Sequence, residues 1–468
     1  MTDSGITRRA ALTGAAAALP LIGGTTTAQA KTASDGFTGR PVPADVARML
    51  REISPANIRR TIEKLVSFGT RNTLSSQTDP DRGIGAARDW LFDEFKKAAL
   101  PSGGRMTVEL QSYVQPVASR IPVPTVITNV VATLPGTAPD SVARTYVVSG
   151  HYDSMPTDPT DFVKDAPGAN DDASGVAAVL EMARVMATRQ FDATVVFMAV
   201  AGEEQGTYGS NFFATQAKAN GKNIAGMFTN DIIGSSTGPA GERDPFSIRV
   251  FAEGLANPAS PLEADWRRFG GDETESPSRQ LARYIKEVAE NEATHMKVNI
   301  MYRRDRLGRG GDHIPFLQQG YSAVRFTEPK EDYRHQHQDV RVENGVQIGD
   351  LPEFVDYDYC ARAARVNAAA LAALARSPAE VQGALINVAG LRADTELRWT
   401  PNTEADLAGY EVVLRAPTAP QWEHTIEVGN VTNTTLKNVS KDNFWFGIRA
   451  TDTQGNRSPV ASPRPTTT

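Results

Sequence analysis

The sequence predicts an α/β protein with a mostly parallel central sheet sandwiched by helices, followed by an all-β immunoglobulin-like sandwich. Two observations predict this architecture. Across residues 44–376, short apolar runs of strand type alternate with segments whose apolar residues recur at helical spacing. After Pro378 the helical spacing stops, and strand-like runs follow one another at intervals of about eight to twelve residues. We therefore expect an α/β domain over residues 44–376 and a separate β domain over residues 380–464.

The α/β part begins with amphipathic segments. Residues 43–71 predict two helices, the second of which starts at Ser54-Pro55, and residues 83–100 predict another helix. Further helices are expected at 174–189, 209–220, 278–293 and 353–375. Strands are expected at 106–114, 125–136, 145–154, 194–206, 224–234, 246–254 and 320–329. The run at 194–206 is continuously apolar over most of its length, as expected for a strand with both faces covered.

The amino terminus has the pattern of an export signal. Arg8 and Arg9 precede a mildly apolar stretch rich in alanine and leucine, and an Ala-Gln-Ala sequence ending at Ala30 forms a small-residue cleavage site. Paired arginines with weak hydrophobicity are typical of the twin-arginine route. We predict a signal peptide at 1–30, a flexible lead-in at 31–43, and a bacterial protein that is periplasmic or extracellular. The alternative is a basic amino terminus that precedes a disordered leader.

Composition excludes several classes of protein. The chain of 468 residues has a formal net charge of −6, which argues against a broad nucleic-acid-binding surface. Cys360 is the single cysteine, so neither an intramolecular disulfide nor a cysteine-based zinc site can form. Beyond the leader, no apolar run approaches the roughly 20 residues that span a bilayer. We expect no nucleic-acid partner and no transmembrane segment.

Acidic residues and one histidine follow several predicted strands. Because parallel strands end at one edge of a sheet, we expect these side chains to lie together. They are His151, Asp153, Asp171, Asp172, Glu203, Glu204 and Asp231. Each alone has a structural explanation: a buried histidine, a helix cap, a solvated glutamate pair or a turn-forming aspartate. Their joint occurrence favours a divalent metal site, and so many carboxylates suit two metals that share a bridging carboxylate.

The ordered motifs HYD, GANDDASG, AGEEQG, NDIIG, GGDHIPF and HQHQD resemble those of the M28 family of di-zinc aminopeptidases, whose fold is of the zinc-exopeptidase type. The resemblance covers roughly residues 45–375. It implies that His151 and Asp231 bind one Zn²⁺ ion, that Asp171 bridges two, and that Glu204 binds the second.

The resemblance also implies roles for two further carboxylates. Asp153 would stand behind His151 and orient its imidazole. Glu203 would be the general base that deprotonates the attacking water. Asp172 is expected at the start of a helix rather than among the metal ligands.

The last ligand is a histidine in the segment EDYRHQHQDVR. The family places it four residues before an aspartate, which favours His335, four residues before Asp339, with His337 as the alternative. The family often has a tyrosine directly before this histidine, where it polarises the scissile carbonyl. Here Arg334 occupies that position and Tyr333 precedes it, so both are candidates for stabilising the oxyanion.

The carboxy-terminal β domain resembles a fibronectin type III module. Trp399, Tyr410 and the ending FWFGIRATDTQGNRSP carry that resemblance. Such modules act as spacers or binding platforms, so this one could bind a polymer or a protein partner.

Together these features predict an exported metallopeptidase that removes amino-terminal residues with a di-zinc-activated water and Glu203 as base. One alternative is a carboxypeptidase, a dipeptidase or a one-zinc, glutaminyl-cyclase-like acyl transferase on the same scaffold. The other is a non-catalytic binding protein, against which the complete set of acidic residues argues.

Overall fold

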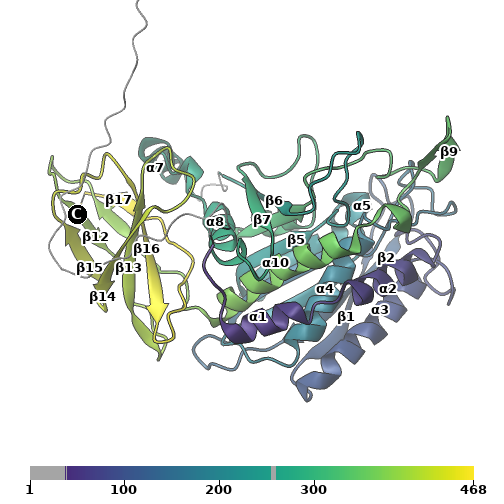
Figure 1. Ribbon diagram of the computed structural model, residues 1–468, viewed down its shortest axis with the longest axis horizontal. Coiled ribbons are helices and arrows are strands. Elements are labelled where there is room, and N and C mark those ends of the chain that lie inside the picture. Colours follow the sequence, from purple (N-terminus) through teal and green to yellow (C-terminus); the bar gives the residue numbers. More distant parts are fainter. Residues whose placement is uncertain (1–36, 38, 255–259, 468) are drawn as a thin grey trace, which may run out of the picture. The chain divides into compact units, whose positions relative to one another are not determined.

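The structure is a computed structural model, shown in Figure 1, that describes residues 37, 39–254 and 260–467. The predicted signal peptide at 1–30 lies outside the described residues, as does most of the predicted lead-in. In the described part of the chain, no helix is both long and apolar enough to cross a membrane.

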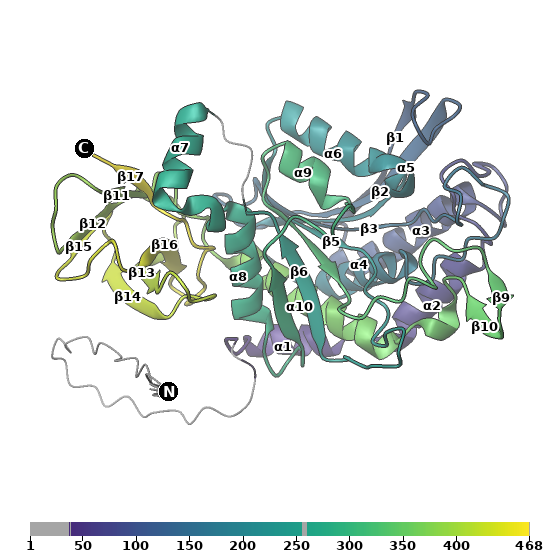
Figure 2. The ribbon, with the colours of Figure 1, turned by 90° about the horizontal axis from the view of Figure 1, so that it is seen from above.

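An eight-stranded sheet forms the centre of the α/β domain (Figure 2). Its strands, in spatial order, are β1 (Thr107–Gln115), β2 (Thr125–Leu134), β4 (Thr194–Val200), β3 (Arg144–His151), β5 (Asn223–Asn230), β8 (Ala323–Thr327), β6 (Ser247–Ala252) and β7 (Lys297–Met301). The central strands β4, β3, β5 and β8 are parallel, whereas β1 and β2 pair antiparallel, as do β2 with β4 and β6 with β8. The predicted fold class is confirmed, with a sheet that is parallel at its centre and mixed toward its edges.

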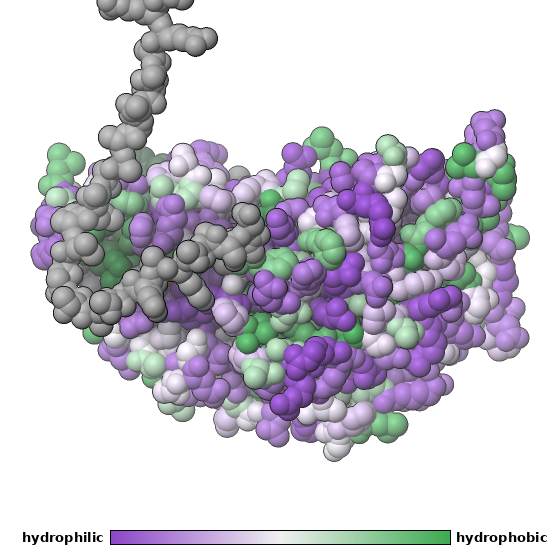
Figure 3. Space-filling view, viewed as in Figure 1, coloured by the Kyte–Doolittle hydropathy of each residue, from purple (hydrophilic) through white to green (hydrophobic). Residues whose placement is uncertain are grey.

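Helices cover both faces of this sheet. One face carries α1 (Ala44–Arg51), α2 (Pro55–Val66), α3 (Ile84–Ala99), α4 (Ala173–Met186), α8 (Pro277–Ala289) and α10 (Tyr357–Arg376). The other carries α6 (Tyr208–Ala219) and α9 (His313–Gln318). Successive residues of β4 serve the two cores, since Phe197 packs in the first and Met198 in the second. Hydrophilic side chains cover most of the outer face of the α/β domain seen in Figure 3.

Side-chain caps fix the starts of the predicted helices. Ser54 accepts a hydrogen bond from the main-chain N–H of Asn57 (3.4 Å), which confirms the predicted start of α2. Asp172 caps α4 by accepting from the N–H of Gly175 (3.0 Å), as expected for a helix-start residue. The same carboxylate accepts from the N–H of His151 (2.9 Å) and so ties the start of α4 to the end of β3.

Two glycines allow α4 to approach the sheet closely. A Cβ atom on Gly150 of β3 would lie 2.5 Å from the main chain of Gly175, and one on Gly175 would lie 2.3 Å from the carbonyl oxygen of Asn230. Because the obstructing atoms are main-chain atoms, no side-chain rotation can make room for a methyl group. This contact sets the position of the loop that precedes α4.

Gly175→Ala is therefore expected to lower the free energy of unfolding by about 1–3 kcal/mol, the usual cost of overpacking a core. Gly226→Ala is the matched control, since its new Cβ would meet only side-chain atoms of Tyr146 and Leu281 at 3.3 Å and 3.4 Å. Chemical denaturation of both variants measures the difference. Equal losses of stability would contradict the close contact between α4 and the sheet.

The structure corrects one predicted strand and adds elements that the sequence pattern does not predict. The strand expected at 194–206 ends at Val200, and Gly202, at a φ of 76°, turns the chain into the short helix α5 (Glu203–Gly206). The unpredicted elements are α7 (Pro261–Gly270), α9, β7, β9 (Arg341–Glu343), β10 (Val346–Ile348), and the 3₁₀ turns Leu100–Ser102, Asp272–Thr274 and Pro352–Phe354.

The carboxy-terminal part forms the predicted β-sandwich. Its strands are β11 (Leu385–Asn387), β12 (Thr395–Arg398), β13 (Leu407–Arg415), β14 (His424–Gly429), β15 (Asn433–Leu436), β16 (Trp445–Asp452) and β17 (Arg464–Thr466). One sheet has the order β15–β12–β11–β17 and the other β14–β13–β16. Trp399 and Tyr410 lie in the core between them with ring centroids 5.3 Å apart. The fibronectin type III resemblance stays a prediction.

Buried ion pairs connect this sandwich to the α/β domain. Glu275 binds Arg283 of α8 at 2.9 Å and also binds Arg415 of β13. Arg449 of β16 lies 3.0 Å from Glu287 of α8. Removing one partner of such a buried pair would leave an uncompensated charge, which is strongly destabilising.

Candidate metal centre

Several loops deliver acidic and histidine side chains to one edge of the central sheet. His151 is the last residue of β3, and Asp231 directly follows β5. Glu204 lies in α5, just after β4, whereas Asp171 lies in the loop before α4. His337 lies in the loop after β8. The parallel order of β4, β3 and β5 places the ends of these three strands together, as the sequence predicts.

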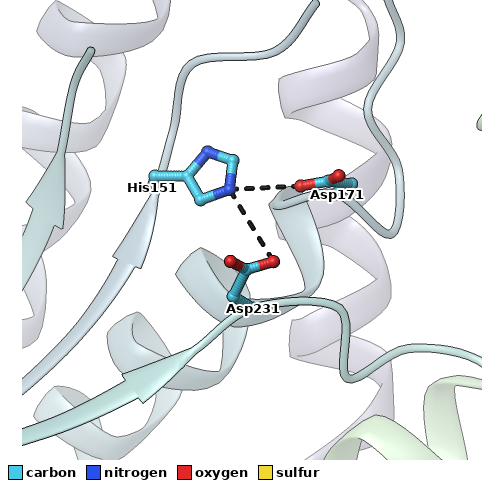
Figure 4. A group of neighbouring side chains, drawn as sticks. All are labelled: His151, Asp171 and Asp231. Carbon is cyan, nitrogen blue, oxygen red and sulfur yellow. Dashed lines mark ion pairs between the residues drawn. The ribbon is translucent and has the colours of Figure 1, made fainter. Parts of the chain in front are cut away.

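The side chains form two groups that share one carboxylate. In the first, Nε2 of His151 lies 3.1 Å from Oδ1 of Asp171 and 4.0 Å from Oδ1 of Asp231 (Figure 4). In the second, Nε2 of His337 lies 3.0 Å from Oδ2 of Asp171 and 3.1 Å from Oε2 of Glu204. The potential ligand atoms of each group lie within 4.8 Å of one another. Each oxygen of Asp171 thus faces a different group, which is the arrangement of a bridging carboxylate.

The structure places His337, rather than the favoured His335, in these groups. The His335 ring stacks on Phe354 with centroids 3.8 Å apart and planes at 10°, and it takes no part in either group. The preference rested on spacing from Asp339, but Asp339 turns outward and binds Lys164 at 2.8 Å. His337 has a φ of 50°, which is an uncommon backbone conformation for histidine, and its side chain joins the second group.

The chemistry of these donors fits divalent cations. Oδ1 of Asp171 and Oε1 of Glu204 are buried, and neither accepts a hydrogen bond from any described residue. Burial is the largest cause that raises the pKa of Glu204 and that of Asp231 above their usual values. Burial alone would lower the pKa of His337, but Glu204 and Asp171 raise it to about 11. The neighbouring carboxylates repel one another, and a cation bound between them would offset that repulsion. It would also contact the carboxylate oxygens that accept no hydrogen bond. The nitrogen and oxygen donors suit zinc.

Asp153 contacts residues on both sides of the centre. Its Oδ1 atom lies 3.6 Å from Nδ1 of His151, which also contacts the main-chain oxygen of Asp153 at 3.1 Å. Its carboxylate accepts hydrogen bonds from the N–H groups of Glu203 (3.3 Å) and Glu204 (3.0 Å). One fully buried side chain therefore positions the imidazole and the start of α5 together.

Glu203 lies beside the two groups without belonging to either. It is half-buried, whereas Glu204 is almost completely buried, so its carboxylate remains accessible to a substrate. Burial is the largest cause that raises the pKa of Glu203 well above its usual value, and Asp231 and Glu204 raise it further. A carboxylate with these properties can accept a proton.

Three supporting residues are not identified by the sequence analysis. Asp350 accepts hydrogen bonds from the N–H groups of Asn170 (2.8 Å) and Asp171 (2.7 Å) and so fixes the loop before α4. Arg325 is completely buried and lies 3.0 Å from Oδ1 of Asp231. Both oxygens of Asp312 are buried without a hydrogen-bond partner among the described residues. An arginine within the apolar run of β8 is a sequence signal for Arg325, whereas nothing near Asp350 in the sequence indicates its role.

The two oxyanion candidates lie outside both groups. The Tyr333 side chain is 58% exposed. Nε of Arg334 lies 2.9 Å from Asp332, and its Nη2 donates to the carbonyl oxygen of Pro239 at 3.1 Å. Among the described residues, neither side chain forms a hydrogen bond or an ion pair with a donor residue of the two groups.

Comparisons with known proteins agree with this site. Residues 129–344 match peptidase family M28. A probable zinc metalloprotease of Pyricularia oryzae is 53% identical over 430 residues, which cover 90% of this chain and 85% of that protein. A probable zinc metalloprotease of Leptosphaeria maculans is 50% identical over 427 residues, which cover 91% of this chain and 98% of that protein.

Among solved structures, the LapA aminopeptidase of Legionella pneumophila shares the fold. It is 18% identical, has a TM-score of 0.50, and the match covers 74% of this chain and 78% of that chain. The family match, the relatives at about half identity and the site geometry lead to one conclusion: this chain belongs to peptidase family M28 and is a zinc metallopeptidase.

Proposed function

We propose that this chain is an exported aminopeptidase that removes amino-terminal residues from peptides or proteins with two zinc ions and Glu203 as general base. One observation carries the proposal: two donor groups share the carboxylate of Asp171, and Glu203 stands beside them as a free carboxylate. The leader pattern at 1–30 supports export, and mass spectrometry of secreted protein should find Lys31 at its amino terminus.

The two groups define which side chains would hold each ion. His151 and Asp231 would bind one zinc ion, Glu204 and His337 would bind the other, and Asp171 would bind both. Bound zinc supplies Lewis acidity, which polarises a carbonyl group and lowers the pKa of a nearby water molecule.

The chain itself supplies the proton transfers. Glu203 accepts a proton from the attacking water and returns it to the nitrogen of the departing amine. Asp153 keeps Glu203 and Glu204 at fixed positions through their N–H groups. Arg325 holds Asp231 in place by an ion pair of 3.0 Å.

The donor geometry bears on the alternatives. A one-zinc acyl transferase needs only one of the two groups, whereas His337 completes a second group with its own histidine. A non-catalytic binding protein has no use for a half-buried carboxylate with a raised pKa beside such donors. A carboxypeptidase or dipeptidase would use the same donors, so the end of the peptide that is cleaved must be measured.

The decisive assay compares a free peptide with its amino-acetylated form, with and without a chelator. We expect the enzyme to cleave the free peptide and not the acetylated one. Chelation should lower the rate by about a hundredfold or more, because zinc contributes several kcal/mol to transition-state stabilisation. Re-addition of zinc should restore activity, and metal analysis should find two ions per chain.

Two outcomes would contradict the proposal. Release of carboxy-terminal residues from the acetylated peptide would identify a carboxypeptidase. Full activity after complete removal of metal would exclude a zinc mechanism.

A further inference from the structure

A recess lined by arginines lies beside the metal centre. Its volume is about 480 Å³. Four arginines line it together with Phe251 and Tyr333, and none of its lining residues is acidic: the arginines are Arg249, Arg303, Arg306 and Arg309. The recess is formed by the ends of β6 and β7 and by the loop after β7. Such a concentration of guanidinium groups needs negative charge to balance it.

One buried carboxylate accounts for part of that balance. Glu331 pairs with both Arg249 and Arg306 and accepts a hydrogen bond from Gln336 (3.0 Å). Burial would raise the pKa of Glu331, but Arg306, Gln336 and Arg249 together hold it below its usual value. Glu331 is therefore ionised, and its single charge is shared by two arginines.

Arg303 and Arg309 carry the remaining charge. Both residues are exposed. Neither guanidinium group forms an ion pair or hydrogen bond with any residue in the described ranges, although both line the recess. Asp305, which lies between them in the sequence, forms an ion pair with Arg325 instead, at 3.0 Å. The recess thus presents two unpaired cations to solvent.

The recess is physically connected to the metal centre. The guanidinium group of Arg325 bonds on one side to the carbonyl oxygen of Gly310 (2.5 Å), at the end of the arginine-rich loop, and on the other to Asp231 (3.0 Å). Arg325 therefore links the loop that lines the recess to one donor residue of the metal centre.

We propose that this recess binds a carboxylate of the substrate, and that the enzyme prefers acidic peptides. The inference rests on the proposed function. The carboxylate could be the side chain of aspartate or glutamate next to the scissile bond, or the free carboxy terminus of a short peptide. The planar fork of arginine matches either carboxylate with two parallel hydrogen bonds. The role of Tyr333 would then be to line this recess rather than to stabilise an oxyanion.

The test uses the zinc-loaded, full-length enzyme and matched tripeptides. Glutamate or glutamine occupies the first or second position, and each peptide carries a free or an amidated carboxy terminus. We expect kcat/KM to favour the acidic or free-carboxylate member by about ten- to a hundredfold at low salt, as for hydrogen bonds to charged groups. The preference should shrink as salt is added. The pair that shows the preference identifies the source of the carboxylate.

Two variants show whether the preference for acidic peptides depends on the arginines of the recess or on the overall positive charge of the loop. The double variant R303Q/R309Q should lower the ratio of acidic to neutral kcat/KM by about tenfold. R304Q is the matched control, because Arg304 is exposed and adjacent but does not line the recess, and its ratio should stay that of the wild type. Equal rates for all pairs in the wild type, or an unchanged ratio in the double variant, would overturn the proposal.

A binding measurement keeps this test independent of the proposed function. The dissociation constants of the same peptides are measured on zinc-loaded E203Q protein with and without R303Q/R309Q. Tighter binding of the acidic peptides that disappears in the arginine variant supports the recess even if no peptide is cleaved. Cleavage without any acidic preference in rate or binding would leave the peptidase intact and reject the recess.

Discussion

Glu203→Gln is expected to lower kcat by about a hundred- to ten-thousandfold, the usual contribution of a general base, while the protein keeps its zinc. Glutamine has nearly the same shape as glutamate but cannot accept the proton of the attacking water. Because Glu203 belongs to neither donor group, its replacement leaves the metal ligands unchanged. KM should change little, since the interaction that is lost belongs to the transition state.

The neighbouring Glu204→Gln variant provides the comparison. Glu204 lies 3.1 Å from His337 in the second group, so this variant should lose metal as well as activity. Steady-state kinetics and metal analysis on both proteins measure the contrast. If Glu203→Gln lost zinc to the same extent as Glu204→Gln, Glu203 would be a ligand and not the base. If it kept full activity, another group would have to accept the proton.

The fold could be predicted from sequence where the pattern is long and periodic. The run around Val148 and the helix from Ala173 to Met186 both lie deep in the core, so their apolar content directly reports their position. The short helix after Val200 could not be predicted in this way. It depends on Gly202 at a positive φ and on two N–H groups that bind Asp153, and neither feature changes the apolar pattern.

The metal centre could be predicted only as far as strand ends locate it. His151, Asp231 and Glu204 follow parallel strands and come together for that reason. Both candidate histidines lie in the loop between β8 and β9, where spacing from Asp339 favours His335 although His337 joins the donor groups. The spacing also gives no sign that the His335 ring stacks on Phe354, because Phe354 lies outside the local motif.

The residues that support the metal centre could not be predicted, because their partners are distant in the sequence. Asp350 lies 180 positions from Asn170, yet it holds the loop that carries Asp171. Burial raises the pKa of Asp231 and the charge of Asp171 raises it further, whereas the buried Arg325 lowers it. A sequence reports which charges exist, but their compensation follows only from the folded chain.

His337→Ala is expected to remove one of two zinc ions and to lower kcat/KM by at least about a hundredfold. Replacing residues that only support metal ligands already lowers metal affinity or activity by about ten- to a hundredfold. The variant breaks the second group and leaves His151, Asp171 and Asp231 in place. His335→Ala is the matched control, two residues away in the same loop. It should keep both ions and lose the stacking on Phe354, which contributes about 0.5–1.5 kcal/mol to stability, and the 4.0 Å contact with Asp332.

Metal analysis and thermal unfolding of the two variants test this assignment. If His335→Ala lost zinc and His337→Ala kept it, His335 would be the metal ligand, as the spacing favours. Loss of both ions from His337→Ala alone would still assign the ligand to His337. It would also show that the two positions are coupled, because Oδ1 and Oδ2 of Asp171 face the two groups and each ion keeps this carboxylate oriented for the other.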